Sequence, residues 1–245
     1  MSEPERFKAE VEANIRGLSA DRDVQALSRI WAREVTRHRY TYNFTWMGRP
    51  IIQTPQDMVA LQEVIWKTRP DAIVETGIAH GGSLIMNASF LHLLGGDGKV
   101  VGVDIDIRAH NRVEIEKHPM AGRITLIEGS SIEQSTVDRV KAAIAGRSRV
   151  MVILDSNHTL DHVQRELALY APLVTRDCYL VVFDTLLEDM PADLQGNRPW
   201  GPGNGPKTAV HRFLQGNDRF TIDHDIEHKL LITVAPDGWL RCVRD

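Results

Sequence analysis

The chain has 245 residues, with 29 Lys and Arg against 33 Asp and Glu, a formal net charge of -4 and 42% hydrophobic residues. A chain of this length can bury a sizeable core, and its mild acidity argues against nucleic acid as a partner, because phosphate binding requires clustered basic residues. Its 2 cysteines exclude a disulfide framework, an iron–sulfur cluster and a four-thiolate zinc site. No apolar run approaches the roughly 20 residues that span a bilayer, and the charged start of the chain lacks the apolar stretch of a signal peptide. We therefore expect a soluble, cytoplasmic enzyme without a membrane span.

Residues 1–50 are predicted to form an N-terminal helical arm, because charged residues alternate with apolar ones at helical spacing. Two interpretations of this arm stay open: it packs on the core or on another subunit, or it covers the active site. After the helix-breaking residues Gly48 and Pro50, Thr54 and Pro55 have the residue types that begin a helix, and the predicted helix runs to about Thr68.

Residues 51–245 alternate between short apolar runs and amphipathic segments, which predicts an α/β fold with a mostly parallel sheet of seven strands covered on both faces. The expected strands are 71–77, 99–106, 123–129, 149–157 and 178–185, with closing runs at 219–225, 229–238 and 239–245. The expected helices between them are 81–96, 132–146, 158–174 and 208–216. Short turns separate the last three runs, so we expect an antiparallel edge at the C-terminal end. No boundary of a second domain is visible after residue 50.

A glycine-rich loop follows the first of these strands and continues into a helix. The strand ends at Glu75, and the loop contains Gly77, His80, Gly81 and Ser83. Glycines allow close approach of the backbone to a ligand, and a helix N-terminus offers free N–H groups. The spacing matches neither a dinucleotide fingerprint nor a P-loop. Ligand binding and tight strand–helix packing both explain this loop.

Polar residues also end the next two strands. Asp104 ends the second strand and is suited to accept the two ribose hydroxyls of an adenosine group. Ser130 and Ser131 follow the third strand and are suited to contact an adenine edge. The order of glycine loop, acid and polar loop resembles the S-adenosylmethionine (SAM) site of class I methyltransferases. In those enzymes the first acid, here Glu75, faces the cationic end of the cofactor.

Acidic residues end the fourth and fifth strands. Asp155 and Asp184 are expected to converge on one edge of the sheet, where carboxylate oxygens suit Mg²⁺. Capping of the helices that follow is the alternative role for these aspartates. His158, three residues after Asp155, is a candidate general base, since histidine titrates near neutral pH.

Several segments together resemble the rhamnosyl O-methyltransferase/CmcI family, often labelled cephalosporin hydroxylases. The resemblance covers roughly residues 40–245, and its most specific part is the Trp-Gly-Pro-Gly-Asn run at 200–204. The matching segments are VETGIAHGGS, LDSNHT, VVFDT, NRPWGPGNGPKTAVHRFL and KLLITVAPDGWL. This resemblance implies a Rossmann-like class I methyltransferase fold, SAM and Mg²⁺ as cofactors, a sugar acceptor such as rhamnose on a natural product or glycan, and a homo-oligomer.

The family pattern also implies roles for individual residues. Asp155 and Asp184 match metal ligands, and His158 matches the catalytic base. Asp155 is also expected to be a catalytic residue and to contact the cofactor. The chain departs from the pattern at Phe183, where related enzymes carry the first acid of a pair. The residues that offer a substitute oxygen ligand are Asn157, Glu188 and Asp189.

The connection 185–206 is long and rich in Pro and Gly, so we expect a lid-like loop or a static loop at a subunit contact. Trp200 is a candidate to stack on the sugar, and Lys207 begins the next helix as a second candidate substrate contact. Around the strand turn near the C-terminus, His224, Asp225 and His228 offer a weaker second candidate for a metal site.

Two other functions compete with methyl transfer as an explanation of the sequence. The first is an oxidoreductase or hydroxylase component that binds a nicotinamide or another nucleotide. It lacks support because no His-x-Asp/Glu pair of an iron site is present. None of the tyrosines has a Lys four residues later, as the family of short-chain reductases requires; they are Tyr40, Tyr42, Tyr170 and Tyr179. A non-enzymatic partner subunit with a SAM fold is the other rival, and the retained Asp155, His158 and Asp184 argue against it.

Overall fold

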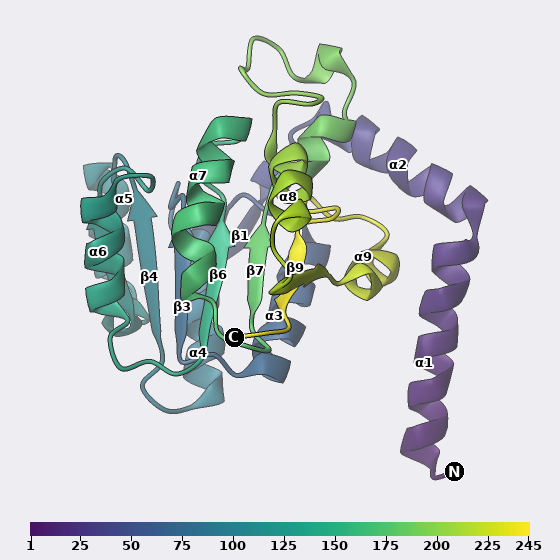
Figure 1. Cartoon of the computed structure of the whole chain (residues 1–245), viewed down its shortest axis with the longest axis horizontal. Coiled ribbons are helices and arrows are strands. Elements are labelled where there is room, and N and C mark those ends of the chain that lie inside the picture. Colours follow the sequence, from purple (N-terminus) through teal and green to yellow (C-terminus); the bar gives the residue numbers. More distant parts are fainter.

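The computed structural model describes the backbone of residues 1–245 and every side chain except that of Ala192. A central sheet has the strand order β5-β4-β3-β6-β7-β9-β8, of which Figure 1 labels β4, β3, β6, β7 and β9. Its strands are β3 (Ala72–Thr76), β4 (Lys99–Asp104), β5 (Ile124–Glu128), β6 (Val150–Leu154), β7 (Tyr179–Val182), β8 (Phe220–Ile222) and β9 (Trp239–Cys242). The first five are parallel, whereas β9 runs antiparallel to both β7 and β8. The predicted α/β class and the antiparallel edge are confirmed.

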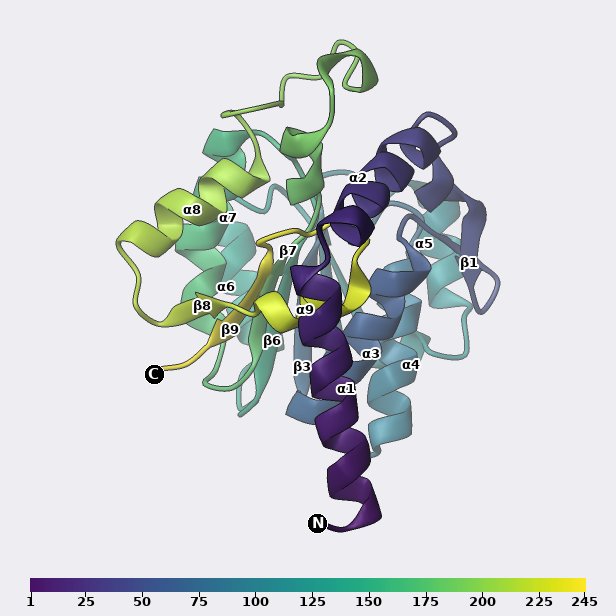
Figure 2. The same cartoon turned by 90° about the vertical axis from the view of Figure 1, so that its right-hand side faces the viewer.

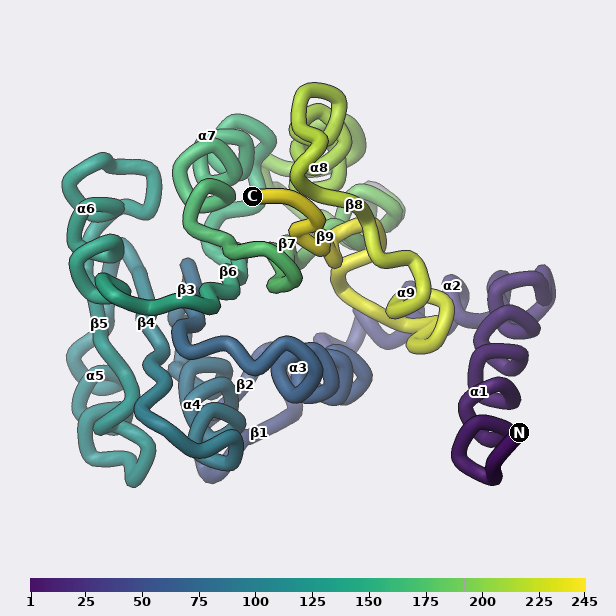
Figure 3. The backbone as a smooth tube through the Cα atoms, turned by 60° about the horizontal axis from the view of Figure 1, so that its bottom comes forward, coloured from purple at the N-terminus to yellow at the C-terminus, as the bar shows by residue number. Residues whose placement is uncertain are grey.

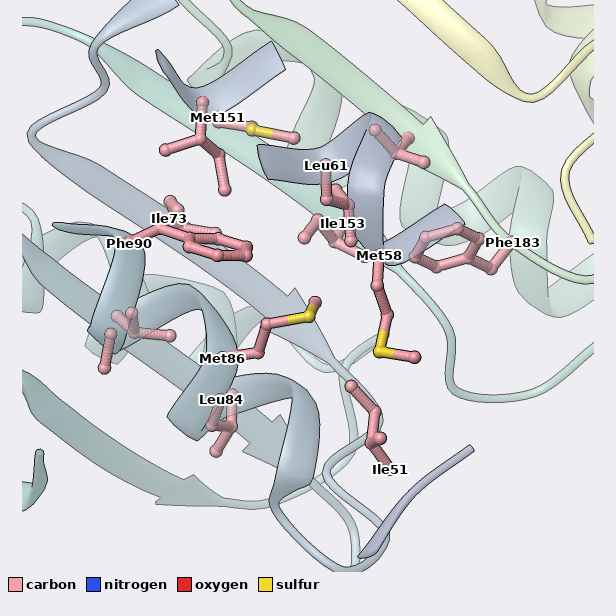
Figure 4. Packing of buried hydrophobic residues seen from close by; sticks show 14 of the residues in the cluster. Ile51, Met58, Leu61, Ile73, Leu84, Met86, Phe90, Met151, Ile153 and Phe183 are labelled. Carbon is pink, nitrogen blue, oxygen red and sulfur yellow. The ribbon is translucent and has the colours of Figure 1, made fainter. Parts of the chain in front are cut away.

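Helices cover both faces of the sheet, as Figure 3 shows along the strands. One layer contains α3 (Pro55–Thr68), α4 (Gly82–Leu94) and α5 (Ala109–Glu116); the other contains α6 (Gln134–Ala143), α7 (Leu160–Tyr170) and α8 (Pro206–Gln215). Successive side chains of β6 point to opposite faces of the sheet. Met151 and Ile153 therefore pack in one buried cluster, and Val152 and Leu154 pack in the other. Figure 4 shows part of the first cluster, with Phe183 beside Met58. Burial on both faces explains why these strands are almost continuously apolar.

The start of α3 is tied to the C-terminal segment by one buried acid. Thr54 caps α3 as predicted, since its hydroxyl accepts from the Asp57 backbone N–H at 3.2 Å. The Asp57 carboxylate accepts from the Thr233 hydroxyl at 2.5 Å and from the Val234 backbone N–H at 2.9 Å. Burial raises the pKa of Asp57 to about 6, although these hydrogen bonds oppose the shift.

The closing segment differs from the prediction in one place. Residues 229–238 do not form a strand: α9 (His224–Leu230) ends there, and an irregular stretch leads to β9. Leu231 has a positive φ of 60°, which interrupts an extended run. The Val234 N–H bonds to Asp57 and is therefore engaged outside a strand ladder. Helix α5 was also not predicted, because its sequence lacks a clear apolar period.

The N-terminal residues form two helices, α1 (Glu3–Ala20) and α2 (Arg22–Thr36), joined at Asp21, whose side chain accepts from the N–H groups of Asp23 and Val24. Helix α1 extends along one side of the body and has no buried residue (Figures 1 and 2). Phe7 is 66% exposed on it. No described helix combines the length and the apolar character that crossing a membrane requires. The expected homo-oligomer stays a prediction.

A small hairpin completes residues 1–50 and was not predicted. Strands β1 (Phe44–Trp46) and β2 (Arg49–Ile51) pair antiparallel around Met47 and Gly48, which both have positive φ. The hairpin packs on the start of α4, where a Cβ on Gly82 would lie 2.2 Å from the Pro50 carbonyl oxygen. The helix-breaking residues Gly48 and Pro50 therefore belong to a hairpin rather than to a simple connection, and Pro55 begins α3.

Candidate active site

The glycine loop between β3 and α4 is shaped by close packing. Gly77 has a φ of +88°, and a Cβ there would lie 2.0 Å from the Asp155 carbonyl oxygen. Gly81 has a φ of +82°, and a Cβ there would lie 2.4 Å from the Ile115 side chain. Both positions exclude larger residues for reasons internal to the fold, so the packing interpretation accounts for them. The loop is held further by Arg49, whose guanidinium donates to the His80 carbonyl at 2.7 Å.

Glu75 is buried beneath this glycine loop. It is 1% exposed, and its carboxylate accepts from the Ser83 hydroxyl and from the Asn87 amide, the latter at 2.8 Å. Burial raises the pKa of Glu75 to about 7. Two residues that were each predicted to bind the cofactor, Glu75 and Ser83, thus bond to each other, and Glu75 anchors the start of α4.

Asp104 fixes the other side of the loop. One carboxylate oxygen accepts from the Ile78 N–H at 2.8 Å, and the other from the Asp106 N–H at 3.1 Å. The glycine loop is therefore bonded to the carboxyl end of β4, where the sequence placed a ribose-binding acid.

Asp155, His158 and Asp184 converge at the ends of β6 and β7. Each offers one ligand atom, and these atoms all lie within 4.8 Å of one another. His158 Nε2 lies 3.1 Å from Asp184 Oδ2. Burial and the neighbouring Asp184 carboxylate raise the pKa of Asp155 well above its usual range. Two carboxylates and an imidazole this close can bind a cation and exchange a proton.

The departure at Phe183 has a packing explanation. Its ring is 3% exposed and meets Trp239 edge to face, with centroids 6.0 Å apart. An acid at this position would lie in the apolar layer seen in Figure 4.

The three residues that offered a substitute oxygen ligand for the metal have other hydrogen-bond or ion-pair partners. Asn157 Oδ1 accepts from both the N–H and the hydroxyl of Thr159. Glu188 accepts from the N–H groups of Gly203 and Thr208, and Asp189 pairs with Lys207 at 2.6 Å. Neither Glu188 nor Asp189 belongs to the cluster of His, Cys, Asp and Glu side chains, which among the described residues consists of Asp155, His158 and Asp184.

The loop 185–206 contacts the cluster through Trp200. The Trp200 and His158 rings meet edge to face at 4.9 Å between centroids, and the Arg198 guanidinium lies 5.5 Å from the Trp200 ring centroid. Lys207 is not brought to the same place, because it pairs with Asp189 at the base of the loop. Trp200 therefore contacts the predicted base directly, whereas Lys207 holds the loop.

Ser131 belongs to a neighbouring polar network that the sequence did not reveal. His162 Nε2 lies 3.1 Å from the hydroxyls of both Ser131 and Ser156, and Ser156 donates to buried Glu166 at 2.7 Å. This network joins the ends of β5 and β6 to α7. Ser130 lies half-buried next to it.

These elements enclose a cavity of about 690 Å³ at the carboxyl edge of the sheet. The predicted site residues that line it are Gly77, His80, Ser83, Asp104, Asp155, His158 and Asp184. The predicted residues outside the described lining are Glu75, Gly81, Ser130, Ser131, Trp200 and Lys207.

The sequence did not indicate most of the residues that form the outer wall of this cavity. Residues of α2, including Trp31 and Val35, line the cavity opposite Leu186 and the stretch 193–198. Arg37 and Asp193 form an ion pair at 3.3 Å between these two walls. Helix α2 thus covers the site, in agreement with the second interpretation of the arm. The apolar spacing of α2 showed a packing face but not its target.

The strand order with its antiparallel edge, together with a cavity at the ends of β3, β4 and β6, is the arrangement of a class I methyltransferase fold. The model of the rhamnosyl O-methyltransferase/CmcI family matches residues 38–243, and the chain belongs to this family. The prediction of a SAM-dependent O-methyltransferase is thereby confirmed.

Two relatives agree with this assignment, and one solved structure agrees with the fold. The rhamnosyl O-methyltransferase of Mycobacterium tuberculosis is 32% identical over 206 residues, which cover 80% of this chain and 77% of that protein. That of Mycobacterium leprae is 29% identical over 214 residues, covering 83% and 87%. A solved structure of CmcI with Mg and SAM has a TM-score of 0.59 at 19% identity and covers 83% of this chain and 78% of its own. At that identity it supports the fold.

Proposed function

We propose that the protein transfers the methyl group of SAM to a hydroxyl of a rhamnose-like sugar, with Mg²⁺ bound by Asp155 and Asp184 and His158 as the general base. The observation that carries the proposal is the convergence of these three residues on the wall of a cavity that also contains the glycine loop and Asp104. The names of the mycobacterial relatives support a rhamnosyl acceptor, and the Mg and SAM of the CmcI structure support the cofactors.

The donor set fits Mg²⁺, because two carboxylates provide the hard oxygen ligands that this ion takes, with water completing its shell. Burial and, after it, the crowding of acids raise the pKa of Asp155, and a bound cation would relieve that crowding. Bound Mg²⁺ supplies Lewis-acid chemistry, which lowers the pKa of a neighbouring hydroxyl.

The residues of the chain then supply proton transfer and positioning. Asp184 orients the His158 ring through the 3.1 Å contact, and Trp200 packs against that ring from the loop. The acceptor oxygen bonds to the methyl carbon as the carbon–sulfur bond of SAM breaks, and the hydroxyl proton passes to His158. Helix α2 and the loop 185–206 line the cavity, where they would restrict the access of water to the reaction. We propose that this loop acts as a lid.

Mass spectrometry after incubation with SAM, Mg²⁺ and a panel of rhamnosides tests the proposal. We expect a gain of one methyl group that depends on Mg²⁺ and is abolished by a chelator. His158→Ala is expected to lose about 10²–10⁴-fold in turnover while it still binds SAM. His92→Ala, an exposed histidine on α4, is the matched control and keeps its turnover.

Two results would contradict the proposal. Full turnover of both His158→Ala and Asp155→Ala would remove these residues from the chemistry. Thermal stabilisation by NADH but not by SAM would contradict the methyl donor and favour the oxidoreductase alternative.

A further inference from the structure

A second cluster of histidine and carboxylate groups lies on α9 and the turn before β9. His224, Glu227 and Asp237 each offer one ligand atom, and these atoms lie within 4.8 Å of one another. His224 Nδ1 is 3.7 Å from Glu227 Oε2 and 3.9 Å from Asp237 Oδ1. None of the three is among the described residues that line the methyltransferase cavity. The cluster therefore needs its own explanation.

We propose that His224, Glu227 and Asp237 form a binding site for a transition-metal dication of the Zn²⁺ type. One imidazole nitrogen and two carboxylate oxygens are donors that Zn²⁺ accepts at about 2.0–2.2 Å. Donors at that distance around one ion lie about 3.3–4 Å apart, which matches both separations from His224. The two carboxylates also balance the charge of the ion.

The carboxylates are already oriented for this role. Glu227 uses Oε1 to accept from the Asp237 N–H at 2.5 Å, and its Oε2 is the oxygen nearer to His224. Asp237 has Oδ2 at 2.9 Å from His211 Nε2, while its Oδ1 is the oxygen near His224. Each carboxylate thus has one oxygen engaged by the protein and the other available, as expected of metal ligands held by outer partners.

The competing cation in this region is Lys207. Its ammonium lies 3.8 Å from Asp237 Oδ2, the oxygen that also faces His211, but only 2.6 Å from Asp189. Lys207 therefore leaves Asp237 Oδ1 to the cluster. His224 is 54% exposed at its side chain, so an ion can enter from solution.

A bound ion would tie α9 to the turn that precedes β9. That segment also carries Thr233 and Val234, which line the cavity and bond to Asp57. The Thr185 hydroxyl donates to the Pro236 carbonyl at 2.6 Å, next to Asp184. The site would therefore be structural and would stabilise the wall of the cavity rather than take part in methyl transfer.

Zn²⁺ binding to metal-free protein tests the proposal, with all variants made in a His158→Ala background to weaken binding at the catalytic cluster. We expect one equivalent of Zn²⁺ by titration against a chromogenic chelator and by elemental analysis, with a raised melting temperature. His224→Ala is expected to abolish this binding, and His211→Ala to weaken it about 10–100-fold through its contact with Asp237.

His228→Ala is the matched control, because His228 stacks on His224 with ring centroids 6.1 Å apart but is not in the cluster. It is expected to keep the full equivalent. Exposed His224 can be replaced without disturbing the core, and circular dichroism verifies the fold of each variant. Equal Zn²⁺ binding by His224→Ala and His228→Ala, or no Zn²⁺ binding by the background protein, would overturn the proposal. Neither result affects the methylation assay, which uses the unmodified protein with Mg²⁺.

Discussion

Four acids of this protein, two of them buried and two that line the cavity, fall into two groups with different surroundings. Asp57 and Glu75 have their carboxylates occupied by hydroxyl, amide and backbone donors within the fold. Asp155 and Asp184 instead line the cavity and lie near each other and near His158. Burial raises the pKa of Asp57, Glu75 and Asp155 alike, so a raised pKa alone does not distinguish the groups. What distinguishes them is whether the fold or a ligand satisfies the charge.

Of the four substitutions considered, Asp155→Asn, in the second group, should have the largest effect. We expect turnover to fall by at least about 10³-fold, equal to about 4 kcal/mol of transition-state stabilisation, because an amide is a poor Mg²⁺ ligand. The melting temperature should not fall, since the change removes one of two neighbouring carboxylate charges. Product formation and calorimetric SAM binding check this, and wild-type turnover by the variant would place Asp155 with the structural acids.

Asp57→Asn should have the opposite effect, because it should lower the stability of the protein rather than its turnover. An amide nitrogen facing the donors of Thr54, Thr233 and Val234 leaves at least one of them unsatisfied, which costs about 1–3 kcal/mol of unfolding free energy. For a chain of this size that corresponds to roughly 2–4 °C in melting temperature per kcal/mol. Denaturant unfolding measures the loss. Unchanged stability with lost activity would contradict a structural role.

Glu75→Gln should change the pH dependence of stability. Burial raises the pKa of Glu75 to about 7 from 4.5, so the folded state binds this proton more tightly than the unfolded chain does. Its stabilising contribution is complete below about pH 4.5 and is lost as the pH rises through about 7. The difference in unfolding free energy between wild type and variant should shift by on the order of 3 kcal/mol across this range. Denaturant titrations without SAM measure it, and parallel pH profiles would refute it.

Arg37→Ala should have the smallest effect. Its partner Asp193 represents a third kind of environment for an acid, which is exposed. The Arg37–Asp193 pair is exposed on both sides, and such pairs contribute about 0–1 kcal/mol. We expect up to about a fivefold rise in acceptor KM with little change in kcat, because the pair joins α2 to the loop without touching the cluster. Initial-rate kinetics at low and high salt measure it, and a larger loss of kcat would assign the pair a part in closing the cavity.

The sequence predicted the sheet well because strands buried on both faces must be apolar throughout. It also identified Asp155, His158 and Asp184 as neighbours, since the carboxyl ends of adjacent parallel strands meet at one edge. It failed at residues 229–238, where apolar residues suggested a strand. The partner that draws the Val234 N–H away, Asp57, lies far along the chain.

The sequence by itself determined the fold class, the family and the residues at the strand ends, because these depend on local periodicity and on short motifs. Only the tertiary structure decided that α2 and the loop 185–206 form the outer wall, that Phe183 belongs to the core and that Lys207 lies outside the cavity. It also showed that Glu75 is enclosed by Ser83 and Asn87. These outcomes depend on which distant segments meet, and hydrophobic burial is not directional, so a local pattern shows that a face is buried but not what covers it.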